Sequence, residues 1–184
     1  MKKYWYKTAM LVMALGVFTA CSDDDGPKIP EGPIALVNGA YVINTGNWNE
    51  NNGTIQWYDR DLKTVSADLF AAANGAGIGD AQDLCVYGTK IYITCSSSAK
   101  IEIVDRKDFK RIKTLNLTNE SGQPIQPRYM TAAKGNIYFT AYDGTVSQID
   151  TTSLSITKKI EVGGSHPEAL TSANGKLYIN LSNY

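Results

Sequence analysis

The sequence predicts an all-β fold, and three observations support that prediction. Short segments rich in β-branched and aromatic residues recur along residues 34–184, each bounded by Gly, Asn, Asp, Pro or Ser. A tyrosine within such a segment repeats, with 46 residues from Tyr92 to Tyr138 and 40 from Tyr138 to Tyr178. Helical periodicity is weak and confined to residues 68–74. Four strands in a repeat of this length are typical of one blade of a β-propeller.

The repeats contribute the same elements in the same order. A tyrosine strand follows a shorter strand, a strand ending in Ile/Val-Asp or Tyr-Asp comes about ten residues later, and a fourth strand closes the unit. The side chains of Asp59, Asp105 and Asp150 are expected to accept hydrogen bonds from backbone N–H groups two residues on, closing the turn to the fourth strand. The expected strands are residues 39–44, 54–59 and 64–69; 83–86, 90–94, 100–105 and 111–117; 128–131, 136–140, 145–150 and 156–162; and 168–171 and 176–180.

These units amount to about three and a half four-stranded blades. Closed propellers typically have about four to eight blades, and a half-built blade exposes sheet edges that favour aggregation. We therefore expect a fragment of a seven- or eight-bladed propeller. Closure of the ring by the pairing of two chains is the alternative.

Residues 1–20 predict a secretory signal peptide. Three lysines precede an uncharged run over residues 8–20, which is too short for a membrane span of about 20 apolar residues. Residues 21–33 continue with an acidic run and a Pro/Gly-rich stretch that is typical of a tether. The partial propeller is therefore expected to occupy residues 34–184.

The junction between signal and tether resembles a bacterial lipobox. Residues 18–21 read Phe-Thr-Ala-Cys, in which Phe and Thr depart from the usual Leu and Ser or Ala. The resemblance implies that Cys21 is acylated and anchors the protein in outer-membrane lipid. The next four residues resemble the acidic export signal that sends Bacteroidota lipoproteins to the cell surface: Ser22, Asp23, Asp24 and Asp25. The alternatives are an ordinary signal peptide with an incidental Cys and a plain acidic linker.

The repeat itself resembles the YVTN repeat. Its Tyr-hydrophobic-Thr/Asn motif is followed by Ile/Val-Asp, and residues 158–170 are a close copy of that repeat's latter half. Together with the signal and the acidic motif, the sequence resembles the YVTN/YncE-like β-propeller surface lipoproteins of Bacteroidota. Some of these capture corrinoids (vitamin B12-like molecules) and pass them to a TonB-dependent outer-membrane transporter, whereas others are surface-layer proteins. The resemblance implies the fold specifically and the function only broadly.

Composition excludes several function classes. The sequence carries 18 basic and 18 acidic side chains and a single His. Zero net charge gives no sign of a nucleic-acid partner, and one His cannot build a multi-histidine metal site. Residues 75–79, Gly-Ala-Gly-Ile-Gly, lack the spacing of a dinucleotide-binding loop. We therefore predict no metal and no cofactor.

The resemblance places a ligand over the propeller axis, on one face built by residues 44–53, 70–82, 95–99, 118–127, 141–144 and 163–167. The first of these loops is the most informative, because a Trp among amide side chains suits stacking on a flat ligand. Its candidate binding residues are Asn47, Trp48, Asn49 and Asn51. The alternative is a Trp that folds back on the sheet as a lid.

Polar residues near the inner strands complete the predicted binding site: Asp80, Asp83, Arg128 and Tyr142. Arg128 and Glu168 are expected at equivalent places one blade apart, with Asp83 at that place in the preceding blade. All three are expected to point toward the axis.

These features favour a non-enzymatic, surface-anchored binding protein whose ligand is a corrinoid or another bulky nutrient. A structural or adhesive surface-layer protein with a protein or glycan partner is the alternative. A lactonase-like propeller enzyme is the third hypothesis. It would hold a metal at the axis through Asp80, Asp83 and Glu168.

Overall fold

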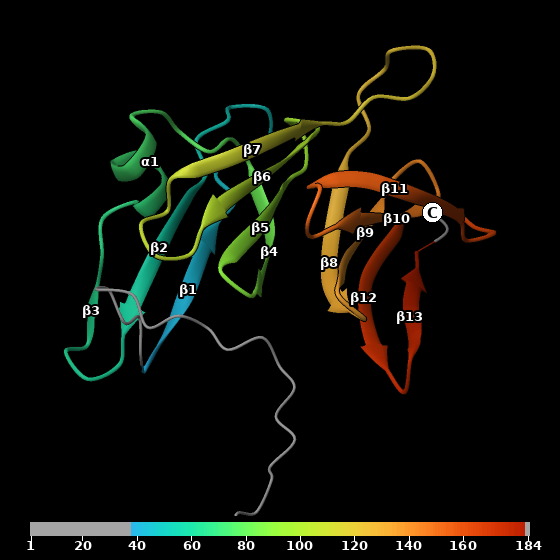
Figure 1. Cartoon of the computed structure of the whole chain (residues 1–184). Helices are drawn as coiled ribbons and strands as arrows, with labels where there is room; N and C mark the ends of the chain where they lie inside the picture. The colour runs from blue at the N-terminus through green and yellow to red at the C-terminus, as the bar shows by residue number, and fades with distance from the viewer. Residues whose placement is uncertain (1–37, 183–184) are drawn as a thin grey trace, which may run out of the picture.

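The computed structural model describes residues 38–182, in which every strand belongs to one of four antiparallel sheets (Figure 1). Each strand pairs with its neighbour in the sequence, so each sheet is a meander. We number these sheets blades 1 to 4. Blade 1 holds β1 (Gly39–Asn44), β2 (Thr54–Asp59) and β3 (Thr64–Val65); blade 2 holds β4 (Ala81–Tyr87), β5 (Lys90–Cys95), β6 (Lys100–Asp105) and β7 (Arg111–Asn116); blade 3 holds β8 (Pro127–Ala133), β9 (Asn136–Ala141), β10 (Thr145–Asp150) and β11 (Ser155–Glu161); blade 4 holds β12 (Pro167–Ala173) and β13 (Lys176–Leu181). The predicted lipidation and export residues, 21–25, lie outside the described residues.

The all-β prediction is confirmed, and blades 2 and 3 are the four-stranded units that the repeat predicts. The predicted turns are also present. Asp59 Oδ1 accepts hydrogen bonds of 2.9 Å from the backbone N–H groups two and three residues on. Asp105 and Asp150 accept bonds of 2.7 and 3.1 Å from the N–H two residues on. These carboxylates therefore close the turns between the third and fourth strands.

The strand predicted over residues 64–69 is wrong beyond Val65. The chain leaves the sheet and forms helix α1 (Leu69–Asn74), which Asp68 caps by accepting a hydrogen bond from Phe70 N at 3.1 Å. Ser66 Oγ and Asp68 Oδ1 also accept bonds from backbone N–H groups of β2, so side chains replace the strand ladder here. Across residues 38–182, no helix has the length and apolar character needed to cross a membrane.

The blades pack face to face through two apolar cores. One core joins blades 1 and 2 and includes Ile55, Phe70, Ile91, Ile93 and Val104. The other joins blades 2 and 3 and includes Tyr92, Ile101, Ile103, Ile137, Phe139 and Ile149. Alternate residues of β5 and β6 enter one core or the other, so both faces of blade 2 are buried.

A buried ion network crosses the outer part of blade 2. The Glu102 side chain is 1% exposed and accepts hydrogen bonds from Lys100 Nζ (2.8 Å), Arg111 Nε (2.9 Å) and Thr114 Oγ1 (2.7 Å). Burial by itself disfavours the charged carboxylate, and it is the largest single influence on the pKa of Glu102. The hydrogen bonds from Lys100 and Thr114 and the two positive charges outweigh it, and the pKa of Glu102 lies below its ordinary value of 4.5.

We predict that Glu102→Gln lowers the free energy of unfolding at neutral pH by about 1.5–3 kcal/mol, because hydrogen bonds to a charged group are lost. The pKa of this carboxyl is lower in the folded chain than in the unfolded one. Its stabilising contribution is therefore complete above the unfolded value and is lost as the pH falls below it. Urea unfolding followed by circular dichroism at several pH values measures both effects. The wild type should lose stability toward about pH 3 more steeply than Glu102→Gln, and parallel pH profiles would contradict this account.

Candidate functional site

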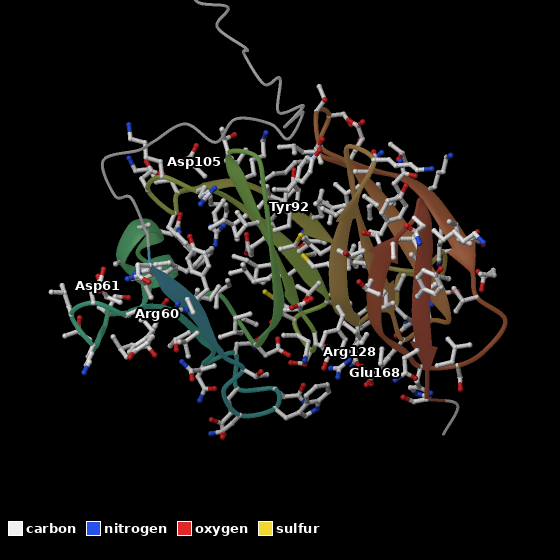
Figure 2. The ribbon with its side chains drawn as sticks, turned by 90° about the horizontal axis from the view of Figure 1, so that it is seen from below. Arg60, Asp61, Tyr92, Asp105, Arg128 and Glu168 are labelled. Carbon is white, nitrogen blue, oxygen red and sulfur yellow. The ribbon has the colours of Figure 1, made fainter. Side chains whose placement is uncertain are left out.

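Loops at one end of the blades contact one another and form a continuous surface. Gly53 N, in the loop between β1 and β2, donates to Gly79 O, just before β4, at 2.7 Å. Tyr142 N, in the loop between β9 and β10, donates to Gln126 O, just before β8, at 3.0 Å. We call this surface the loop face; it consists of residues 45–53, 75–80, 96–99, 117–126, 142–144 and 162–166. Figure 2 shows Arg128 and Glu168 at this end of the blades and the turn residue Asp105 at the other.

Threonine side chains fix the inner strand of one blade against the next. Thr94 Oγ1 on β5 donates to Arg128 O on β8 at 2.7 Å, and Thr140 Oγ1 on β9 donates to Glu168 O on β12 at 2.8 Å. Both threonines are fully buried. The repeated bond places Arg128 and Glu168 at equivalent positions of blades 3 and 4, as the sequence predicts.

The residue equivalent to Arg128 in blade 2 is Gln82, and the prediction of Asp83 was wrong. Thr94 Oγ1 lies 3.4 Å from Asp83 O, just as Thr140 Oγ1 lies 3.3 Å from Tyr129 O. The residue one place earlier is the extra residue of a β-bulge in both strands. The sequence held a usable signal, because counting back ten residues from each repeated tyrosine gives Gln82, Arg128 and Glu168.

These three residues and a tyrosine form one hydrogen-bonded group, the axial cluster, which consists of Gln82, Arg128, Tyr142 and Glu168. Arg128 Nε donates to Glu168 Oε2 at 3.0 Å, and Arg128 Nη1 donates to Gln82 Oε1 at 2.8 Å. The Tyr142 hydroxyl donates to Glu168 Oε1, and the guanidinium carbon of Arg128 lies 4.7 Å from the centre of the Tyr142 ring. Figure 2 shows Arg128 and Glu168 beside each other on neighbouring inner strands. The structure thus joins the predicted residues Arg128 and Tyr142.

The axial cluster is mostly buried and its charges are balanced. The Arg128 and Glu168 side chains are 14% and 17% exposed, so their ion pair is shielded from much of the solvent. The guanidinium also lies over the Tyr129 ring, 5.6 Å from its centre. The side chains hold one another in fixed positions. They can therefore offer oriented donors and acceptors to a ligand edge at a low cost in conformational entropy.

Trp48 lies on a loop whose backbone is held by its own amide side chains. Asn52 Oδ1 accepts a bond of 2.7 Å from Asn47 N, and Glu50 Oε2 accepts bonds of 2.8 and 3.0 Å from the Asn47 and Asn52 side chains. Asn49 and Asn51 adopt positive φ angles of 63° and 52°, which Asn tolerates better than most residues. The Trp48 side chain is 55% exposed, so it does not fold back as a lid. The amides thus shape the loop, and the indole stands free of the core.

Asp80 is fully buried and shapes the loop between β5 and β6. It accepts hydrogen bonds from the backbone N–H groups of Ser97 and of Ser98, the latter at 2.9 Å. Burial is the largest single influence on the pKa of Asp80 and acts to raise it. The hydrogen bonds from Ser97 and Ser98 together outweigh burial and hold this pKa below its ordinary value. The Ser98 hydroxyl also donates to Asn51 Oδ1 at 2.6 Å. Asp80 and Asn51 are thus connected through Ser98, and their hydrogen bonds stabilise the loops of the loop face.

Asp83 points toward the neighbouring blade. Its Oδ2 accepts a hydrogen bond of 2.7 Å from Met130 N, which ties β4 to β8. Burial raises the pKa of Asp83 above its ordinary value, against the opposing effect of hydrogen bonds from the Met130 and Leu84 backbones. Within residues 38–182, no group of three or more His, Cys, Asp and Glu side chains is arranged to hold a metal ion.

Solved structures with similar folds are β-propeller proteins. Kuenenia stuttgartiensis hydrazine synthase matches 70% of this chain and 36% of its own, with 18% identity and a TM-score of 0.57. The WD40 β-propeller domain of Doa1 matches 77% of this chain and 47% of its own, with 16% identity and a TM-score of 0.57. The dihydro-heme d1 dehydrogenase NirN in complex with DHE matches 68% of this chain and 27% of its own, with 12% identity and a TM-score of 0.53.

At these identities the likeness concerns the fold alone, and this chain spans less than half of each structure. None of the curated proteins is similar to the chain. The model of one protein family matches residues 38–183, which are well over half of the sequence. The protein therefore belongs to the family described as a domain of unknown function, DUF5074.

Proposed function

We propose that this protein is a lipid-anchored, cell-surface binding protein whose loop face captures a bulky, flat nutrient without transforming it. The candidate ligand is a corrinoid, which the protein would deliver to a TonB-dependent outer-membrane transporter. The lipobox-like and acidic motifs at residues 18–25 support the location. The resemblance to YVTN-repeat surface lipoproteins supports the ligand class.

The exposed Trp48 is the single observation that carries the proposal. The indole is 55% exposed, and its loop is fixed by hydrogen bonds from Asn47 and Asn52. An exposed indole on a hydrogen-bonded loop supplies stacking area, and little backbone entropy is lost on binding. The axial cluster on the same face supplies polar groups for a ligand rim.

Binding without chemistry is supported by how the carboxylates are used. Asp80 accepts hydrogen bonds from Ser97 and Ser98, and Asp83 accepts one from Met130. Glu168 is paired with Arg128 at 3.0 Å. Each carboxylate that a lactonase-like mechanism would need therefore serves a structural contact.

We predict that Trp48→Ala weakens cyanocobalamin binding by roughly tenfold to hundredfold, because stacking on an aromatic side chain is worth about 1–3 kcal/mol. Isothermal titration calorimetry measures the affinity. The matched control is Leu62→Ala, since Leu62 is 72% exposed in the turn at the other end of blade 1. Both variants should keep the wild-type melting temperature. The corrinoid proposal fails if the wild type itself does not bind, or if Trp48→Ala binds as tightly as Leu62→Ala does.

We predict that Cys21→Ala converts the protein from a membrane-bound to a soluble form, because acyl chains on Cys21 would supply the membrane affinity. Fractionation of cells into membrane and soluble material, followed by immunoblotting, measures the distribution. A Cys21→Ala protein that stays in the membrane fraction would rule out the lipid anchor at this residue.

The acidic motif should act on surface export and leave anchoring intact. We predict that replacing Asp23, Asp24 and Asp25 together with Ala keeps the protein in the membrane fraction but protects it from protease added to intact cells. Replacing the lysines of residues 1–7 is unsuitable as a control, because it alters the signal peptide. Lys28→Ala, in the tether, is the matched control and should remain protease-sensitive. If protease cleaves the triple variant on intact cells as readily as the wild type, the export assignment is wrong.

A further inference from the structure

A pocket of about 200 Å³ lies between blades 2 and 3, separate from the axial cluster. Its lining comes from the end of β7, the loop before β8, and strands β9, β10 and β11. We call it the inter-blade pocket. Its apolar lining consists of Leu117, Ile125, Phe139, Ala141 and Ile156, and its polar lining of Asn116, Thr118, Asp143, Thr145, Ser147 and Lys159.

The polar side of the pocket carries one positive and one negative charge. Lys159 Nζ lies 2.7 Å from Asp143 Oδ2, and Thr145 Oγ1 donates to Asp143 Oδ1 at 2.7 Å. Ser147 is a polar residue that is only 5% exposed, and it faces the same pocket. The charged groups lie toward solvent, with the Lys159 side chain 47% exposed, whereas Phe139 and Leu117 form the buried side.

Blade 2 carries long charged side chains at the positions equivalent to Thr145 and Ser147. Lys100 pairs with Cys95 as Thr145 pairs with Ala141, and Glu102 pairs with Ile93 as Ser147 pairs with Phe139. The threonine bonds to the next blade confirm this alignment, because they come from the strand positions between these pairs. Thr145 therefore takes the place of Lys100, and Ser147 takes the place of Glu102.

Blade 3 thus lacks two long side chains of opposite charge that blade 2 has, and the inter-blade pocket lies at their positions. In blade 2, the Glu102 carboxylate and the Lys100 ammonium lie 2.8 Å apart, and the two side chains are 1% and 20% exposed. In blade 3, two short hydroxyl side chains stand at these positions, and the pocket opens over them. The pocket therefore lacks the two long side chains that stand at these positions in blade 2, and its lining keeps one carboxylate and one ammonium of its own, those of Asp143 and Lys159.

We propose that the inter-blade pocket binds a small zwitterion with an apolar body, of the class of α-amino acids with an apolar side chain. The ligand ammonium lies beside Asp143, the ligand carboxylate beside Lys159 and the Ser147 hydroxyl, and the apolar body against Phe139 and Leu117. The volume of about 200 Å³ is below the range of about 300–1,000 Å³ that is typical for drug-sized ligands, which favours a molecule of amino-acid size.

Charge balance favours a zwitterion over a singly charged ligand. The pocket's own ion pair is neutral, so a lone carboxylate or a lone ammonium entering a half-buried site leaves one charge without a partner. A zwitterion provides a partner for each member of the pair. The pocket shares Leu117, Thr118, Ile125 and Asp143 with the loop face, but none of its lining residues belongs to the axial cluster or to the Trp48 loop, so the inference does not require corrinoid capture.

The first test titrates the full chain with L-phenylalanine by calorimetry and by ligand-observed NMR. Three partial ligands separate the contributions: 3-phenylpropionate lacks the ammonium, phenethylamine lacks the carboxylate, and glycine lacks the apolar body. L-phenylalanine should saturate the protein with a dissociation constant at or below about 1 mM, and each partial ligand should bind at least tenfold more weakly. No saturation at about 10 mM, or equal binding of 3-phenylpropionate or phenethylamine, overturns the proposal.

The second test fills the pocket with the residue that blade 2 uses. Ser147→Glu places a carboxylate near Lys159 and should reduce L-phenylalanine binding by at least tenfold. Thr157→Glu adds the same charge at an exposed position of β11 and should bind like the wild type. Lys159→Gln, at a half-exposed position, should also lose at least tenfold and guards against misfolding of the first variant. Unchanged binding in folded Ser147→Glu or Lys159→Gln places the ligand elsewhere and overturns the assignment.

Discussion

The structure depends on hydrogen bonds that cross from one blade to the next. Neighbouring blades share no strand ladder, and apolar packing, which is non-directional, leaves their alignment some freedom. The hydroxyls of Thr94 and Thr140 remove that freedom, since each is buried and donates to one backbone carbonyl of the next inner strand. A buried donor must find its acceptor or lose free energy, so the bond selects a single alignment of the blades. The bond of 2.7 Å between Asp83 and Met130 N reinforces this alignment between blades 2 and 3.

This alignment decides which side chains meet at the axis. It brings Gln82, Arg128 and Glu168, each from a different blade, into one hydrogen-bonded row. The same alignment makes positions of successive blades comparable residue by residue, and it shows where the repeat changes. Blade 2 has the long charged side chains of Lys100 and Glu102 where blade 3 has short hydroxyls, and a pocket opens over those hydroxyls between blades 2 and 3. The alignment of the blades thus stays the same, while the side chains at equivalent positions differ from blade to blade.

The sequence predicted the strands well because their pattern repeats and each blade buries the same positions. It also predicted the turns at Asp59, Asp105 and Asp150, which depend on local hydrogen bonds. It failed where the outcome depends on a neighbouring strand. The end of β3 at Val65 rests on bonds from Ser66 and Asp68 to β2, and the choice of Gln82 over Asp83 rests on a bulge. Of the candidate site, the joining of Arg128 with Gln82 and Glu168 needed the structure, because those hydrogen bonds cross between blades.

The central claim is that the loop face, at the end of the blades where the axial cluster lies, binds the ligand. Hydrogen–deuterium exchange followed by mass spectrometry, on the full chain with and without cyanocobalamin, tests it most directly. The account predicts slower exchange on binding in residues 45–53, 96–99, 126–129 and 142–144, which are the Trp48 loop and the segments around the axial cluster. Residues 60–63, 106–110 and 151–154, in the turns at the other end, should be unchanged. Slower exchange in those turns, or no change anywhere on addition of the ligand, would contradict the account.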